Sequence, residues 1–227
     1  LDRVYTLSLL SRLDPNPQWV ARAADEMLAA AAFSDWNPAH WLDVAEMIHA
    51  LALGYDWLFD RLSVEQRTTI RAAIIDKGLL AAKTAYETSP WWVRDRFNWN
   101  LICNGGVIIG CLALMDEEPE LASSLCSQAI GNLGPVLESF APDGAWAEGP
   151  GYWGYSMQYL STTLASLDTA MGRDFGLGES PGLADAGVFR LQGVGPTGMF
   201  FNFADAGESS SLDPSLFWLA RRYDLPV

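Results

Sequence analysis

The sequence is poor in basic residues, histidine and cysteine. Its 227 residues include 14 Lys and Arg against 28 Asp and Glu, a formal net charge of −14. This excess of acid argues against a nucleic-acid partner, because neutralising phosphates requires a basic surface. The two His and three Cys lack metal-ligand spacing, so we expect neither a metal site nor a cofactor. The cysteines lie in apolar, helical-looking surroundings that predict buried free thiols: Cys103, Cys111 and Cys126.

Long apolar runs are also missing. The longest candidate, residues 101–115, is short for a membrane span and contains Asn104 and three glycines, so no membrane-spanning segment is expected. The first three residues, Leu-Asp-Arg, lack Met and the basic start of a signal peptide. This opening indicates a processed chain or a piece of a larger protein.

Apolar and aromatic residues are plentiful. Half of the residues are apolar and 12% are aromatic, which predicts a folded globular protein rather than a disordered one. Ten tryptophans are many for this length. Tryptophan fills space between helices, and its flat ring also packs against the apolar faces of sugars.

Helical periodicity runs through most of the chain. Ser63 and Gln66 have the spacing of a capping box. The expected helices cover residues 17–33, 37–62, 63–87, 98–115, 118–140, 149–171 and 213–223. Long helices with short connections favour an all-α fold of helical hairpins: a bundle, a solenoid or a closed α/α toroid.

The composition changes after residue 175. Residues 176–205 are rich in glycine, and the stretches 187–193 and 198–205 could each form a short strand. We therefore expect a helical domain over residues 1–175. Residues 176–227 would form the end of that domain and a short β-like segment near the C-terminus.

Three asparagines occur in the motif RDRFNWNLICNGG, residues 94–106. Asn98 is either an N-cap or a functional residue. Asn104 lies inside an apolar helix and needs a hydrogen-bond partner, since an unpaired buried amide costs about 1–3 kcal/mol. The pair Gly105-Gly106 indicates a close approach, more often by another helix than by a ligand. Arg94 and Arg96 offer guanidinium groups suited to carboxylates.

A second motif, PDGAWAEGPGYWGYSMQYL, covers residues 142–160. Asp143-Gly144 is a turn signal. Glu148 precedes a helix, where it would either interact with the helix dipole or act as a catalytic carboxylate. Tyr152 lies in the first turn of that helix, after a glycine-flanked loop, and such positions usually face a cleft. Tyr155 and Tyr159 share a face with Tyr152 and are typical of packing.

Four stretches of the sequence together resemble the heparinase II/III-like family of polysaccharide lyases. They are WLDVAEMIHALALGYDWLFD, FNWNLICNGG, PDGAWAEGPGYWGY and FFNFADAGE. The resemblance covers residues 37–208. It implies an incomplete (α/α) toroid, a β-sandwich beyond this chain, and a periplasmic or secreted bacterial protein. It also implies cleavage of an anionic, uronate-containing polysaccharide by β-elimination.

The family pattern places Asn98 at the uronate carboxylate and Tyr152 at the leaving O4 oxygen. An amide donor can stabilise the charge that grows on the carboxylate, and Tyr is a suitable proton donor. Substrate-binding candidates near the two motifs are Arg94, Arg96, Trp99, Asn100, Trp146, Glu148, Trp153 and Tyr155. Arg190 is a further cation that could offset the acidic net charge.

The sequence departs from the family where Trp99 follows Asn98, because many members carry His at that position. His40 and His49 do not match it. Tyr152 would then act as both base and acid, unless a His comes from outside this chain or the protein has lost lyase activity. Two alternatives therefore stay open. One is a glycoside hydrolase using Glu148 with Asp56, Asp143 or Asp205, and the other is an inactive glycan-binding protein.

Overall fold

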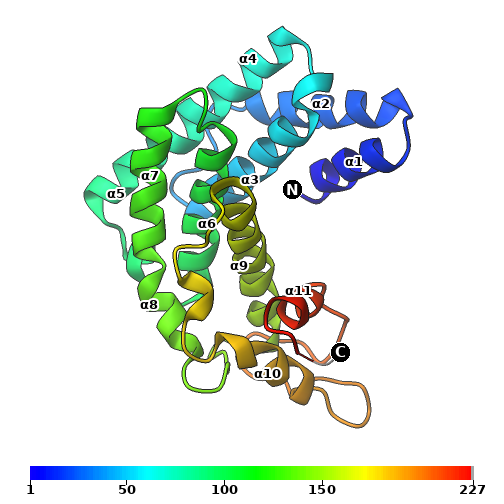
Figure 1. Cartoon of the computed structure of the whole chain (residues 1–227), viewed down its shortest axis with the longest axis vertical. Helices are drawn as coiled ribbons and strands as arrows, with labels where there is room; N and C mark the ends of the chain where they lie inside the picture. Colours follow the sequence, from blue (N-terminus) through cyan, green and yellow to red (C-terminus); the bar gives the residue numbers. More distant parts are fainter. Residues whose placement is uncertain (226–227) are drawn as a thin grey trace. The chain divides into compact units, whose positions relative to one another are not determined.

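The computed structural model describes residues 1–225, and its regular structure is helical (Figure 1). The expected all-α fold is therefore confirmed. The chain divides into two compact units. Among the described residues, the first comprises 1–90 and 103–129, and the second comprises 91–102 and 130–225. The composition change expected at residue 176 falls within the second unit, and the domain boundary there stays a prediction.

The first unit is built mainly from sequential helices that pack on their neighbours. Its helices are α1 (Asp2–Leu13), α2 (Pro17–Ala31), α3 (Trp41–Leu58), α4 (Val64–Ala73) and α5 (Leu80–Thr88), with a π-helical segment at Ile74–Leu79. Residues 103–113 of α6 (Asn98–Ala113) and 119–129 of α7 (Pro119–Asn132) complete it. Ser63 and Gln66 form the expected capping box at the start of α4.

Helix α3 forms the centre of the first unit's core. A Cβ placed on Gly106 of α6 would lie 2.7 Å from the carbonyl oxygen of Ala45 in α3. A Cβ on Gly110, one turn later, would lie 2.4 Å from a side-chain carbon of Ile48. These contacts confirm the expected close helix approach at Gly106. Asn104 also has its partner, because the Tyr86 hydroxyl donates to its Oδ1 at 2.9 Å.

Two sequence expectations for this unit need correction. The helix expected from residue 37 begins at Trp41, because Asn37 has a positive φ of 55° and turns the chain. Helix α1 was not anticipated, because its buried positions include Ser8 and Ser11, which leave little hydrophobic periodicity to detect.

The second unit contains the start of α6 and the long helix α9. After a 3₁₀ turn at Trp91–Arg94, its helices are the start of α6, α8 (Gly134–Leu137), α9 (Gly149–Met171), α10 (Ala186–Gln192) and α11 (Ser215–Arg222). Figure 1 shows α10 and α11 close to the beginning of α9. The single helix expected over residues 118–140 is instead divided into α7, α8 and a 3₁₀ turn.

The strand expected at residues 187–193 is wrong, because this stretch forms α10. Its buried residues, Ala186, Gly187 and Arg190, have helical spacing, and Arg190 is held inside the unit by a hydrogen bond to the Pro150 carbonyl. Residues 198–205 form only isolated β-bridges, Val194 with Phe200 and Met199 with Ser209. No helix among residues 1–225 is long and apolar enough to cross a membrane.

Candidate active site

The two motifs meet through Asn98 and Glu148, which are fifty positions apart and belong to the second unit. Glu148 Oε2 accepts the backbone N–H of Asn98 at 2.7 Å, and Oε1 accepts the side-chain Nδ2 at 2.6 Å. Charge-assisted bonds of this length are among the strong hydrogen bonds of proteins. They join the start of α6 to the residue that precedes α9.

The position of Glu148 explains its role as a cap. It is the N-cap residue of α9, yet its side chain makes no capping bond to that helix. Its carboxylate instead caps the first residue of α6. The positive ends of two helix dipoles, α6 and α9, therefore lie near one carboxylate, and both favour negative charge there.

The side-chain amide of Asn98 is oriented by this contact. Its Nδ2 must face Glu148, because the alternative orientation would set Oδ1 against a carboxylate. Asn98 is only 4% exposed, and its Oδ1 is buried without a hydrogen-bond partner among the residues that the structure describes. A buried, unsatisfied amide oxygen is costly, and such groups occur often at functional sites.

Tyr152 lies four residues after Glu148 and is the fourth residue of α9, at the end of its first turn. Residues four apart on a helix lie on the same face with Cβ atoms about 5–6 Å apart. The Asn98–Glu148 contact thus brings the Tyr152 turn close to the start of α6. Tyr152 is half-buried, so part of its ring remains accessible.

The first turn of α9 contains glycines against which another loop packs. Gly149 has a φ of 83°, and a Cβ there would lie 2.4 Å from the Phe203 carbonyl oxygen. Ala206 makes an ordinary van der Waals contact at Gly151, with its Cα 3.5 Å from the corresponding Cβ position. The loop over residues 203–206 therefore packs against the first turn of α9. Sequence reasoning missed this contact, although the Gly-Pro-Gly sequence marks an unusually crowded backbone.

Arg190 also contacts the first turn of α9. Its Nη1 donates to the Pro150 carbonyl at 2.8 Å, and its guanidinium lies over the rings of Trp153 and Phe200. Burial lowers the pKa of Arg190, and nearby Asp213 opposes that shift. Arg190, named from the sequence as a cation that could offset the acidic net charge, is therefore buried within the unit.

Two of the proposed sugar-stacking tryptophans are core residues. Trp146 is buried and stacked on Phe140, and Trp153 is fully buried under Arg190. Neither ring can contact a sugar in this structure, so packing explains both. Trp99 is half-buried and lies 4.9 Å from the ring of Trp91, which is 61% exposed. This pair is the better aromatic surface for a saccharide.

Asn100 must also be removed from the substrate-binding set. It is fully buried, and its Nδ2 donates to the backbone carbonyls of Val93 and Asn132. The amide therefore ties the start of α6 to its neighbouring segments. Tyr155 is half-buried and packs edge-on against Tyr159, with ring centroids 5.6 Å apart.

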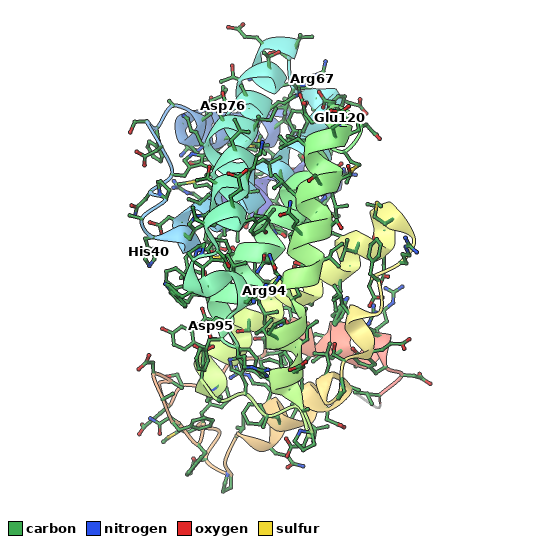
Figure 2. The ribbon with its side chains drawn as sticks, turned by 90° about the vertical axis from the view of Figure 1, so that its left-hand side faces the viewer. His40, Arg67, Asp76, Arg94, Asp95 and Glu120 are labelled. Atoms are coloured by element: carbon green, nitrogen blue, oxygen red, sulfur yellow. The ribbon has the colours of Figure 1, made fainter. Side chains whose placement is uncertain are left out.

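The arginines before α6 differ in their contacts. Arg94, which Figure 2 labels, is exposed and is the last residue of the 3₁₀ turn. Arg96 forms an exposed ion pair with Glu138 at 2.8 Å, which must open before it can bind another carboxylate. Arg94 is thus the better candidate for a substrate carboxylate.

Of the three aspartates named as partners of Glu148 in a hydrolase, two belong to the second unit and one to the first. Asp143 lines a cavity together with Pro150, and Asp205 lies in the loop that packs against α9. Asp56 belongs to the first unit.

Within residues 1–225 no group of three His, Cys, Asp or Glu side chains could hold a metal ion. The three cysteines are buried free thiols, as expected, and burial raises the pKa of Cys126 to about 11. His40 is exposed beside Asp43 on the turn before α3 (Figure 2).

In comparisons with known proteins, no protein-family model matches the chain and no curated protein is significantly similar to it.

Proposed function

We propose that the chain is the helical catalytic part of a polysaccharide lyase that cleaves uronate-containing polymers. The observation that carries the proposal is the double hydrogen bond between Asn98 and Glu148. It brings the asparagine and tyrosine motifs of the heparinase II/III-like pattern together although they are distant in the sequence. The same resemblance supports an (α/α) toroid as the architecture.

Asn98 would hold the carboxylate of the uronate. Its Nδ2 carries two N–H groups, and Glu148 accepts one of them. The second N–H would donate to the substrate carboxylate and stabilise the charge that grows as the C5 proton leaves. The N-terminal ends of α6 and α9 favour an anion at the same place. Glu148 already places one negative charge there, so the exposed Arg94 would offset its repulsion of the uronate, together with the repulsion expected from a net charge of −14.

Tyr152 would carry the proton transfers. The base removes the C5 proton, the C5 electron pair forms the C4–C5 double bond, and the C4–O4 bond breaks. The departing O4 takes a proton from the Tyr152 hydroxyl. Because Trp99 replaces the histidine of many family members, we assign both steps to Tyr152. Its phenolate takes the C5 proton and then gives that proton to O4, so the enzyme returns to its starting state.

The test is the ultraviolet absorbance of the unsaturated uronate product, measured on a panel of alginate, heparan and other uronate polymers. We expect product with at least one polymer. Tyr152→Phe should lower the rate about 100- to 10,000-fold, the usual contribution of general acid–base catalysis. Asn98→Ala should lower it about 100- to 1,000-fold, as loss of an oxyanion donor does.

Tyr223→Phe is the matched control. It also removes one tyrosine hydroxyl from the second unit, where Tyr223 donates to the Gly178 carbonyl at 2.5 Å. Its rate should stay within about twofold of the unchanged protein, since the loss of one such bond costs only about 1 kcal/mol of stability. Folded protein that forms no unsaturated product from any uronate polymer would overturn the lyase proposal.

Two results would favour the other functions. A glycoside hydrolase would release reducing ends without the new absorbance, and Glu148→Gln would abolish activity while Tyr152→Phe would not. A glycan-binding protein would bind saccharides and turn none of them over.

A further inference from the structure

An exposed apolar face lies on α10 and on the segment that follows it, within the second unit. Figure 1 shows this segment in orange, reaching beyond the end of α10. The face consists of large apolar side chains that are open to solvent: Val188, Leu191, Val194, Met199, Phe201 and Phe203. Their exposed fractions amount to roughly 500 Å² of apolar surface, and a patch of that size on a protein surface is often functional.

The local backbone explains why these side chains point outwards. Isolated β-bridges at Met199 and Phe200 hold the segment extended. Phe200 is buried, and the guanidinium of Arg190 lies 4.0 Å from its ring centroid. Successive side chains of an extended segment point to opposite sides, so Met199 and Phe201 face away from the core. A segment that is apolar on both sides is expected to be covered on both sides.

A hollow of about 470 Å³ lies within the apolar face. Its apolar walls include Val188, Phe189, Phe201 and Phe203. Phe201 is 78% exposed, so its ring stands at the edge of the hollow and does not fill it. Hollows of about 300–1,000 Å³ hold drug-sized molecules, and this one therefore has room for an aromatic side chain.

The hollow is preformed by backbone packing. Asp143 and Ala145 line it, and they flank Gly144, which has a φ of 77°. A Cβ on Gly144 would lie 2.3 Å from the nitrogen of Ala186, so this turn touches the first residue of α10. The walls of the hollow therefore come from two segments whose backbones are in contact. A preformed hollow loses little conformational freedom when it is filled, and this favours association.

We propose that the apolar face joins two copies of the chain about a two-fold axis, with Phe201 of each copy inserted into the hollow of the other. The ring and the hollow lie side by side on one surface, which is the self-complementary arrangement that a two-fold interface requires. Aromatic rings in well-packed pockets are the usual anchors of interfaces. With the polar residues around it, the face approaches the area of about 800 Å² that each partner gives to a standard interface. The inference is independent of the proposed lyase function.

The charges at the hollow distinguish a second copy from other occupants. Asp143 and Asp185 line the hollow, and none of its lining residues is Lys, Arg or His. Each copy also carries a formal net charge of −14. Like charges on the two copies repel each other, so added salt should strengthen dimerisation, whereas salt would weaken the binding of a basic partner. The acids also disfavour a negatively charged lipid surface.

Sedimentation equilibrium of the full chain tests the interface. We expect a monomer–dimer equilibrium between about 1 and 100 µM, without larger species, because a two-fold interface closes on itself. Raising the NaCl concentration from about 0.05 to 0.5 M should strengthen dimerisation about threefold or more. Phe201→Asp places a charge in the hollow of the other copy and should weaken dimerisation by about 100-fold or more. Phe33→Asp is the matched control, because Phe33 is an exposed Phe of the first unit, and it should leave dimerisation unchanged.

Disulfide cross-linking locates the contact in a second way. Phe201 both enters the hollow of the other copy and lines its own, so the two Phe201 positions should lie close together across the axis. The native cysteines are buried free thiols, and Phe201→Cys therefore adds an accessible one. Copper-catalysed air oxidation should convert Phe201→Cys to a covalent dimer on a non-reducing gel, and should convert Phe33→Cys much more slowly.

Four results would overturn the interface. They are a chain that stays monomeric at about 100 µM, dimerisation that salt weakens, equal effects of Phe201→Asp and Phe33→Asp, and equal cross-linking of the two cysteine variants. Circular dichroism of each variant shows that the comparison is made between folded proteins. A monomeric chain would mean that a different molecule covers the face.

Discussion

Replacing Glu148 by Ala removes both hydrogen bonds that join α9 to the start of α6. Hydrogen bonds to charged groups contribute about 1.5–3 kcal/mol each. Asn98 is nearly fully buried, so its donors lose their partner without full access to water. Glu148 is half-buried, and solvent therefore weakens its share of the interaction. We expect Glu148→Ala to lower the free energy of unfolding by about 2–4 kcal/mol.

Urea unfolding followed by circular dichroism measures this loss. Glu138→Ala is the matched control, because it removes a glutamate of the same unit whose ion pair with Arg96 is exposed. Exposed pairs contribute about 0–1 kcal/mol. A double-mutant cycle with Asn98→Ala should give a coupling of about 1.5–3 kcal/mol. A coupling near zero, or equal losses for the two glutamates, would refute the link between the motifs.

Two further predictions concern the scaffold. Burial lowers the pKa of His49 to about 3 from its ordinary 6.5. The unfolded chain therefore binds one more proton between these values, and stability should fall by about 1.4 kcal/mol per pH unit from this group as the pH drops from 6.5 towards 3. The double variant Tyr5→Phe/His49→Leu removes the hydrogen-bonded pair. Urea unfolding at several pH values measures how steeply stability depends on pH. An unchanged pH dependence in the double variant would contradict its assignment to His49. Gly144→Ala should cost about 3 kcal/mol in urea unfolding, from its positive φ and the backbone clash. Gly172→Ala is the control, because Gly172 has a positive φ but no atom within 4 Å of the added Cβ. It should lower the free energy of unfolding by about 1–2 kcal/mol. Equal losses for the two variants would contradict a backbone clash at Gly144.

Local features of the sequence predicted local features of the fold well. The capping box at Ser63 is made by neighbouring residues, and the glycines and apolar surroundings at Gly106 and at the cysteines indicated close packing without naming its partners. Hydrophobic periodicity also predicted the long helices. Periodicity did not predict the helix at residues 187–193, because seven residues with scattered apolar side chains fit a strand or a helix equally. Contacts of Arg190 with Pro150 and Phe200 favour the helix.

The candidate site was harder to predict because its key contact is long-range. Glu148 stands where a residue usually caps the following helix, yet it caps α6 fifty positions away. Periodicity also could not separate the buried Trp146 and Trp153 from the accessible Trp91 and Trp99. That distinction depends on which elements cover each ring, and those elements come from distant parts of the chain.

We propose that Asn98 and Tyr152 act together in β-elimination. The most direct measurement is the formation of unsaturated uronate by the unchanged chain, by each single variant and by Asn98→Ala/Tyr152→Phe. We expect product from the unchanged chain, and we expect the double variant to be hardly slower than the slower single variant, because the effects of residues that act as a unit are not additive. Product formed as fast by Tyr152→Phe as by the unchanged chain, or no product from any uronate polymer, would contradict it.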